Sequence, residues 1–280
     1  MRGEFVDIGG RRLRMVRAGP PEARPLIVLE HGAFGCAADW AVVQERLAAK
    51  GFRSLAYDRA GLGHSDPGPE PRDGHAIVAD LAALLRALGE RQPVVLVGHS
   101  MGGLMVRLFA LTHPKQVLGV VLVDAVTPDI MNLPAGPPSI RAFSRLLKVA
   151  KFAAGLGLMR PVAWLTHNLI GLTSEARAEK RRIHGSASHA RWASAEVDFW
   201  PTTSDQAGEQ EFPPKLPIAV ITAGAERVAL ALKTVQAIPA LNSRHGYVEH
   251  VAGAKHASLL GLRFADPIVR GVEQVLAARR

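Results

Sequence analysis

The residues best suited to chemistry lie at positions 98–103, where the chain reads Gly-His-Ser-Met-Gly-Gly. This motif follows the apolar run 94–97 and precedes the helix-like stretch 104–110. A Gly-x-Ser-x-Gly sequence between a strand and a helix is typical of a tight turn that projects the serine hydroxyl above a sheet, and its glycines let the two backbones approach closely. The alternative is an ordinary glycine-rich turn. The flanking strand and helix favour the first interpretation, in which Ser100 is a nucleophile.

A serine hydroxyl is a poor nucleophile at neutral pH, so Ser100 needs a general base beside it. His256 lies in a loop between the last expected strand and the last expected helix, from which it can reach the serine. We therefore predict that His256 is the base; the alternative is a loop histidine bonded only to the backbone. Other histidines are assigned to a helix end (His113), to an insertion (His184, His189) and to the turn itself, pointing away from the nucleophile (His99).

The base requires a carboxylate that holds its tautomer and stabilises the imidazolium. Asp124 directly follows the apolar strand 117–123, at the edge where wound sheets build their sites. Glu226, after the later strand 218–222, is the alternative, and the order serine, acid, histidine holds with either. Each carboxylate could instead cap a helix. We favour Asp124 as the acid.

Acyl transfer also requires backbone N–H groups aimed at the tetrahedral oxyanion. One is predicted at Met101, directly after the serine. The other is predicted at Ala33, in the glycine-containing loop 30–35, with Phe34 as the alternative. Because these residues would act through the main chain, their side chains matter mainly for shape.

Short apolar runs alternate with helical patterns, which indicates an α/β fold with a mostly parallel sheet covered on both faces. A hairpin turning at Gly9 and Gly10 comes before this alternation. The clearest helix spans 73–88, where an apolar stripe ends at Gly89. The expected strands are 4–8, 13–17, 26–29, 53–57, 94–97, 117–123, 218–222 and 247–251; the expected helices are 39–50, 73–88, 104–110, 228–238 and a last one that Asp266 caps and Pro267 opens.

The alternation stops between 128 and 214, which we interpret as a helical insertion into a core made of residues 1–127 and 215–280. Helical patterns cover 140–158 and 162–170, and polar and histidine-containing residues follow Thr173. Its apolar side chains would pack the insertion onto the body, and some could line an acyl pocket; they are Leu146, Leu147, Phe152, Leu156, Leu158, Met159, Trp164 and Leu165. Basic residues on the same helices permit weak contact with a membrane surface or an anionic lipid; they are Lys148, Lys151 and Arg160.

Composition narrows the classes of function. The 280 residues carry a formal net charge of +9 and one cysteine, so no internal disulfide framework exists and a cytoplasmic location is expected. No apolar stretch approaches the roughly 18 residues that span a bilayer, and the first residues lack a signal core. The positive charges are scattered arginines without interleaved aromatic residues, so we expect no nucleic-acid partner. No spacing of histidines and cysteines predicts a metal site, and no pattern indicates an oligomeric state.

Together these residues resemble the α/β-hydrolase family, and the resemblance covers almost the whole chain. The matching segments occur in the family's order: His31-Gly32, residues 58–66, residues 98–103 and the loop carrying His256. The resemblance implies an eight-stranded sheet with a helical lid inserted after the sixth strand, at 128–214. It also implies a Ser-His-acid hydrolase that needs no metal or organic cofactor.

The chain departs from the family pattern in two places. Many members carry an aspartate after the seventh strand, where this chain has Glu226; some lipase-like members place the acid after the sixth strand, at a position similar to Asp124. Glu30 stands where an apolar residue is commoner, and we expect it to form a salt bridge or a loop hydrogen bond. The members with an aspartate nucleophile, the haloalkane dehalogenases and epoxide hydrolases, differ from this chain because position 100 is serine.

The sequence therefore predicts hydrolysis of a small or lipophilic carboxylic ester through an acyl-enzyme on Ser100. The same residues could serve an amidase, a thioesterase, a C–C hydrolase or a perhydrolase. A ligand receptor with this fold and negligible turnover is the alternative from outside the enzymes.

Overall fold

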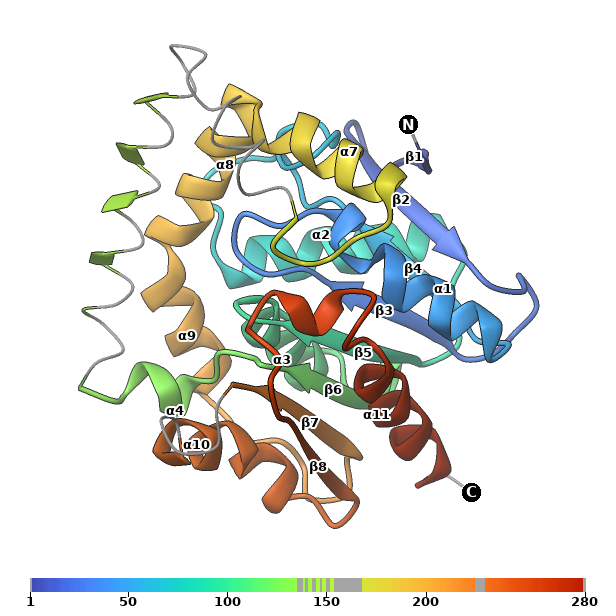
Figure 1. Cartoon of the computed structure of the whole chain (residues 1–280). Coiled ribbons are helices and arrows are strands. Elements are labelled where there is room, and N and C mark those ends of the chain that lie inside the picture. The colour runs from blue at the N-terminus through green and yellow to red at the C-terminus, as the bar shows by residue number, and fades with distance from the viewer. Residues whose placement is uncertain are drawn as a thin grey trace.

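The chain is built around one eight-stranded sheet, shown for the computed structural model in Figure 1. The structure describes residues 2–134, 168–224 and 230–278, together with some positions between 138 and 153. The strand order is β1-β2-β4-β3-β5-β6-β7-β8; β2 is antiparallel to both its neighbours, and all other pairs are parallel. The strands are β1 (Glu4–Asp7), β2 (Arg12–Ala18), β3 (Leu26–Glu30), β4 (Arg53–Tyr57), β5 (Val94–His99), β6 (Val117–Val123), β7 (Ile218–Ala223) and β8 (Gly246–Val251). The predicted fold class is confirmed.

Both faces of the sheet are buried, which explains the continuous apolar runs of its central strands. In β3, Leu26 and Val28 join one apolar core, whereas Ile27 and Leu29 join the other. Helices α2 (Gly74–Ala87), α3 (Gly102–Thr112) and α10 (Leu230–Leu241) pack on the first face, and α1 (Ala41–Ala49) and α11 (Asp266–Ala277) pack on the second. Three short 3-10 turns complete the body: η1 (Ala37–Trp40), η2 (Pro114–Gln116) and η3 (Ser258–Leu260).

The parallel strands bring distant loops to one edge of the sheet. Strands β3, β5, β6, β7 and β8 run in the same direction, so the residues that follow each of them lie at the same end. These loops carry all the residues that the sequence nominates for chemistry, which agrees with the general placement of sites in wound sheets.

Two aspartates stand at the starts of helices, and only one of them caps its helix. Asp73 caps α2, because its carboxylate accepts a hydrogen bond from the Ala76 N–H at 3.0 Å. Asp266 is instead the first residue of α11, and its carboxylate lies 3.2 Å from the guanidinium of Arg46. The predicted cap at Asp266 is wrong by one residue, because Ala265 already has helical backbone angles and occupies the capping position.

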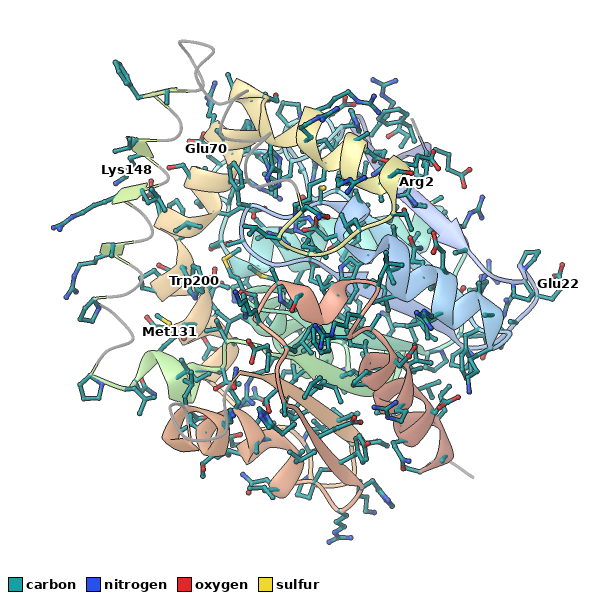
Figure 2. All side chains as sticks on the ribbon, viewed as in Figure 1. Arg2, Glu22, Glu70, Met131, Lys148 and Trp200 are labelled. Carbon is teal, nitrogen blue, oxygen red and sulfur yellow. The ribbon has the colours of Figure 1, made fainter. Side chains whose placement is uncertain are left out.

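The described residues between β6 and β7 form helices: α4 (Pro128–Met131), α7 (Ser174–His184), α8 (Ala187–Asp198) and α9 (Trp200–Gly208). Met131 and Trp200 lie on the same side of the molecule (Figure 2) and both join the apolar core on the α2 and α3 face. The pattern at 140–158 lies largely outside the described residues, and so does the pattern at 162–170. No helix in the described ranges is long and apolar enough to cross a membrane.

Helix α7 shows why the sequence did not predict a helix after Thr173. Its buried side chains are Ala176, Glu179, Lys180 and Ile183, so half of its inner face is charged. An apolar periodicity therefore does not appear, because the face that packs on the body does so partly through ion pairs.

Candidate active site

Ser100 occupies a strained turn between β5 and α3, in the context that its motif predicts. Its φ of 54° lies in the left-handed region, which residues other than glycine seldom adopt. The turn is held by hydrogen bonds from the Ser100 N–H to the Val123 carbonyl at 3.1 Å and from the Val126 N–H to the Ser100 carbonyl at 2.9 Å. A Cβ atom at Gly102 would lie 2.6 Å from the carbonyl oxygen of Glu30, so only glycine lets the backbones come this close.

The predicted base and acid lie in direct contact. The Nδ1 atom of His256 is 2.6 Å from Oδ2 of Asp124, across 132 positions of sequence. The imidazole is half exposed, whereas the side chain of Asp124 is only 13% exposed. With Asp124 ionised, Nδ1 must carry the proton of this hydrogen bond, which leaves the lone pair of Nε2 free to accept another.

Asp124 is itself held from three sides. Its φ of 40° is left-handed, and its Oδ1 accepts hydrogen bonds from the Ala223 N–H and from Nε2 of Gln236, both at 3.2 Å. Burial tends to raise the pKa of Asp124, but the hydrogen bond and charge of His256, together with the Ala223 N–H, outweigh it and lower the pKa below its ordinary value. The alternative acid, Glu226, lies outside the described residues.

His99 contacts the loop that carries the predicted base, His256. Its ring centroid lies 4.6 Å from that of His256, and its Nε2 lies 3.1 Å from the His256 carbonyl oxygen. Burial, reinforced by the neighbouring His256, lowers the pKa of His99 to about 3. The ring is therefore neutral near pH 7, and because a carbonyl oxygen only accepts, Nε2 carries the proton. Motif reasoning placed His99 in the turn but did not indicate this contact.

The predicted oxyanion donors lie in two turns: Ala33 and Phe34 after β3, and Met101 after β5. Among the described residues, the N–H groups of Ala33, Phe34 and Met101 donate to no other protein group. Phe34 has a left-handed φ of 56°, so all three left-handed residues other than glycine in the described chain, Phe34, Ser100 and Asp124, stand where the sequence nominates chemistry. Met101 precedes the first turn of α3, where free N–H groups and the helix dipole favour negative charge. The roles of Met101, of Ala33 and of its alternative Phe34 as oxyanion donors stay predictions.

Sequence reasoning missed two buried residues of this region. Gln236 lies on α10, and no local motif marks it as a partner of Asp124. Arg59 belongs to the segment 58–66 that carries the resemblance, yet its partners come from two distant segments, residues 30–32 and helix α8. One of these partners is Glu30, whose Oε1 lies 2.5 Å from Arg59 Nη1, and the salt bridge expected of Glu30 is thereby observed.

No group of three or more histidine, cysteine, aspartate or glutamate side chains in the described part of the chain is arranged to hold a metal ion.

Comparison of the sequence with known proteins identifies its family. A model of the alpha/beta hydrolase fold matches residues 25–260. The chain belongs to the α/β-hydrolase fold family. Among curated relatives of this family, the match is 38% identical over 122 residues to epoxide hydrolase A of Mycobacterium tuberculosis, covering 43% of this chain and 37% of that protein. It is 37% identical over 123 residues to a non-heme chloroperoxidase of Streptomyces lividans, and 33% identical over 123 residues to the bifunctional esterase/perhydrolase DCH of Acinetobacter calcoaceticus, covering 44% of each chain in both cases.

These alignments span less than half the length of the curated relatives. Solved α/β hydrolases match over the whole chain at low identity. The epoxide hydrolase CorEH aligns with a TM-score of 0.72 at 20% identity, covering 99% of both chains. A thermophilic esterase from Thermogutta terrifontis aligns with a TM-score of 0.72 at 19% identity, covering 99% of this chain and 98% of that one. At these identities the likeness shows the fold alone.

Proposed function

We propose that the protein is a serine hydrolase that cleaves carboxylic esters through an acyl-enzyme on Ser100. The contact between His256 and Asp124, 2.6 Å long, carries this proposal. The pair contacts the neighbours of Ser100: Asp124 follows Val123, whose carbonyl accepts from the Ser100 N–H, and the His256 ring lies 4.6 Å from that of His99. A histidine that donates from Nδ1 to an ionised carboxylate keeps a basic Nε2, which a serine nucleophile needs. Three distant segments thus supply three complementary chemical roles.

In the proposed reaction, Oγ of Ser100 attacks the ester carbonyl carbon and its proton passes to Nε2 of His256. The negative charge on the former carbonyl oxygen is stabilised by the N–H groups of Ala33 and Met101. His256 then protonates the departing alcohol oxygen as the C–O bond breaks. In the second half, His256 takes a proton from water, the hydroxide attacks the acyl carbon, and Ser100 leaves with that proton as the acid is released.

The substrate in this proposal is a small or lipophilic ester, bound beneath a lid formed by residues 128–214. The support for a lid is that α7 and α8 pack over the loops after β3 and β4: Lys180 of α7 pairs with Asp39, and Glu196 of α8 pairs with Arg59. Leu146 and Phe152, which the sequence nominates for packing or an acyl pocket, are 61% and 71% exposed. The other apolar residues nominated there lie outside the described residues.

The relatives named as epoxide hydrolases suggest a rival reaction, which the chemistry of Ser100 disfavours. Attack of a serine oxygen on an epoxide carbon leaves an ether, and water with a general base does not cleave an ether as it cleaves an ester. Such an enzyme would stop after one turnover. Perhydrolysis, suggested by the name of the Acinetobacter relative, needs only hydrogen peroxide in place of water at the acyl-enzyme and is a second activity of the same proposed site.

The test is turnover of p-nitrophenyl acetate, butyrate and octanoate by the wild type and by Ser100→Ala, with styrene oxide as a parallel substrate. We expect saturable ester hydrolysis that Ser100→Ala abolishes, stoichiometric labelling of Ser100 by a fluorophosphonate, and no turnover of the epoxide. Ester hydrolysis that survives Ser100→Ala would refute the proposal. Catalytic opening of styrene oxide would replace it with the rival reaction, and saturable ligand binding without turnover would favour a receptor.

A further inference from the structure

Arg59 is the most heavily engaged buried cation beside the candidate oxyanion loop. It lies just after β4, and its side chain is 1% exposed. Its guanidinium contacts the carboxylates of Glu30 and Glu196 at 2.5 and 2.7 Å. It also donates to the carbonyl oxygens of His31 and Gly32, at 2.7 and 3.1 Å. One planar group therefore connects β4, the loop after β3 and helix α8.

The bond to the Gly32 carbonyl acts on the neighbouring N–H through the geometry of the peptide group. A trans peptide is planar and rigid, so the carbonyl of Gly32 and the N–H of Ala33 belong to one unit and point in opposite directions. The Gly32 carbonyl accepts hydrogen bonds from Arg59, from Nδ1 of His31 at 2.9 Å and from the Gly35 N–H at 3.2 Å. Holding that carbonyl from one side fixes the direction in which the Ala33 N–H points on the other.

The charge of Arg59 also strengthens that donor. Hydrogen bonding polarises a peptide group, so a carbonyl that accepts from a cation makes the N–H of the same unit a better donor. Arg59 keeps its charge here, because the carboxylates of Glu196 and Glu30 raise its pKa although burial alone would lower it. His31 stays neutral, because burial and the charge of Arg59 lower its pKa well below its ordinary value. Arg59 is thus the cation that acts on this carbonyl.

Glu196 extends this connection to the chain between β6 and β7. It lies on α8, is buried, and binds Nε and Nη2 of Arg59 with both carboxylate oxygens. Bidentate pairing fixes the plane of the guanidinium as well as its position. A shift of α8 would therefore move the group that holds the Gly32 carbonyl.

We propose that Arg59 is a positioning residue of the oxyanion hole. By holding the Gly32 carbonyl it orients the Ala33 N–H of the same peptide group, and Glu196 links that orientation to the position of helix α8. The inference rests on the proposed ester hydrolysis, because it assigns an electrostatic role within that reaction. If the inference holds, losing the hydrogen bond from Arg59 to the Gly32 carbonyl weakens stabilisation of the tetrahedral oxyanion but leaves binding of the planar ester nearly intact.

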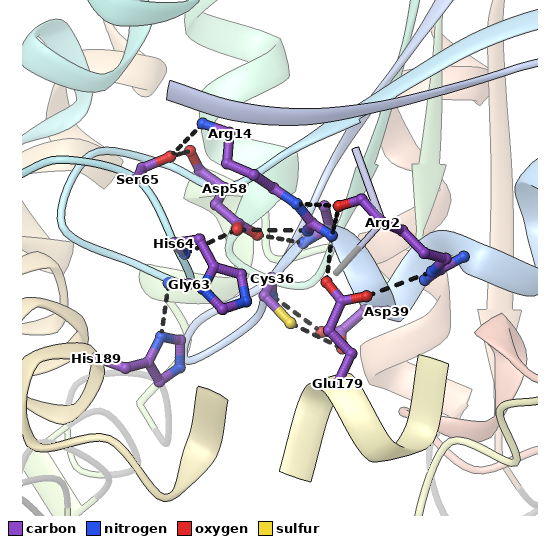
Figure 3. Close-up of polar contacts among 11 residues, drawn as sticks. Arg2, Arg14, Cys36, Asp39, Asp58, Gly63, His64, Ser65, Glu179 and His189 are labelled. Atoms are coloured by element: carbon purple, nitrogen blue, oxygen red, sulfur yellow. Dashed lines mark hydrogen bonds and ion pairs between the residues drawn. The ribbon is translucent and has the colours of Figure 1, made fainter. Parts of the chain in front are cut away.

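A buried arginine elsewhere in the protein provides a matched control. Arg14 of β2 is fully buried and contacts Asp58 and Glu179, the latter on α7 (Figure 3). It therefore also links the body to a helix between β6 and β7. Its contacts do not include the carbonyls of the oxyanion loop; its other acceptor is the carbonyl oxygen of Arg2. Arg14→Lys and Glu179→Gln thus reproduce the cost of disturbing a buried ion pair without touching the Gly32 carbonyl.

The experiment measures kcat and KM for a p-nitrophenyl ester, and Ki for a trifluoromethyl ketone that forms a tetrahedral adduct on Ser100. A lysine at position 59 cannot span Glu196 and both carbonyls, so we expect Arg59→Lys to lower kcat about 10- to 100-fold, the range for a misplaced catalytic group. KM should stay near the wild-type value, and Ki should rise by the factor by which kcat/KM falls. Glu196→Gln should show the same pattern with a smaller change.

Arg14→Lys and Glu179→Gln should lower the melting temperature but leave kcat and Ki close to the wild type. Equal losses of kcat in Arg59→Lys and Arg14→Lys would overturn the inference, as would an unchanged Ki in Arg59→Lys. If Arg59→Lys does not fold, the inference is tested by comparing kcat and Ki of Glu196→Gln with those of Glu179→Gln.

If the wild type hydrolyses no ester, the rate at which a fluorophosphonate labels Ser100 replaces kcat. Slower labelling in Glu196→Gln alone supports the inference, and equal labelling in all variants refutes it.

Discussion

Asp124 allows the sharpest test of a single residue, because the site has two candidate acids. Replacement by asparagine keeps the shape but removes the charge that holds the His256 tautomer and stabilises the imidazolium. We expect Asp124→Asn to lower kcat by about 10³- to 10⁴-fold, the loss typical of a triad acid. Glu226→Gln is the control and should stay close to the wild type in the same ester assay. A large loss in Glu226→Gln with activity retained in Asp124→Asn would move the acid to position 226.

Helix α10 contributes to the site through one amide that crosses to the β6 loop. Gln236 is buried and donates to Asp124 Oδ1 and to the Ala125 carbonyl, both at 3.2 Å. Without this donor, the carboxylate of Asp124 would be less well oriented toward His256. We expect Gln236→Leu to lower kcat about tenfold, because a hydrogen bond to a charged group contributes roughly 1.5 kcal/mol.

Gln44 of α1 provides the comparison for that variant. Its amide is equally buried and donates to the Val16 carbonyl at 2.9 Å, on the other face of the sheet from α10. Gln44→Leu should lower thermal stability without changing kcat, as measured by the ester assay and by thermal unfolding. Equal kcat values for the two variants would show that α10 does not position the acid.

At the scale of the whole molecule, burial keeps four histidines of the described ranges neutral: His31, His99, His184 and His189. Burial lowers the pKa of His99 and of His189 to about 3, and lowers those of His31 and His184 well below the ordinary value. For His189 the contacts agree, because its Nδ1 accepts from the Gly63 N–H at 3.1 Å and so cannot also carry a proton (Figure 3). At these four positions the folded protein therefore binds fewer protons than the unfolded chain below pH ~6.5.

Since the folded pKa values are depressed, the stability that these histidines contribute is present above pH ~6.5 and is lost as the pH falls toward 3. At pH 5 each of His99 and His189 should have lost roughly 2 kcal/mol of unfolding free energy relative to pH 7.5. Urea unfolding at the two pH values measures this loss. His189→Asn should be less stable at pH 7.5 and lose less on acidification, whereas the exposed His75→Asn should follow the wild type. An unfolding free energy that does not fall between pH 7.5 and 5 would contradict the assignment.

Local sequence determined the strands and the turn at Ser100, because these depend on burial and backbone conformation over a few neighbouring residues. The apolar run before Gly98 and the small residues around Ser100 specify the turn, since no bulkier residue fits where β5 and α3 approach. The strand that ends at Val123 was located to the residue, because a fully buried parallel strand is a continuous apolar run. The expected order of serine, acid and histidine also followed from which residues stand at the ends of such strands.

Only the tertiary structure decided which polar groups meet. His256 and Asp124 are 132 residues apart, and Arg59 and Glu196 are 137 apart, so no local period relates either pair. The polar helix α7 and the amide of Gln236 also escaped prediction, because a buried ion pair or hydrogen bond gives no apolar pattern along the chain. Backbone preference acts between near neighbours, whereas the satisfaction of a buried charge depends on whatever side chain the completed fold brings to it.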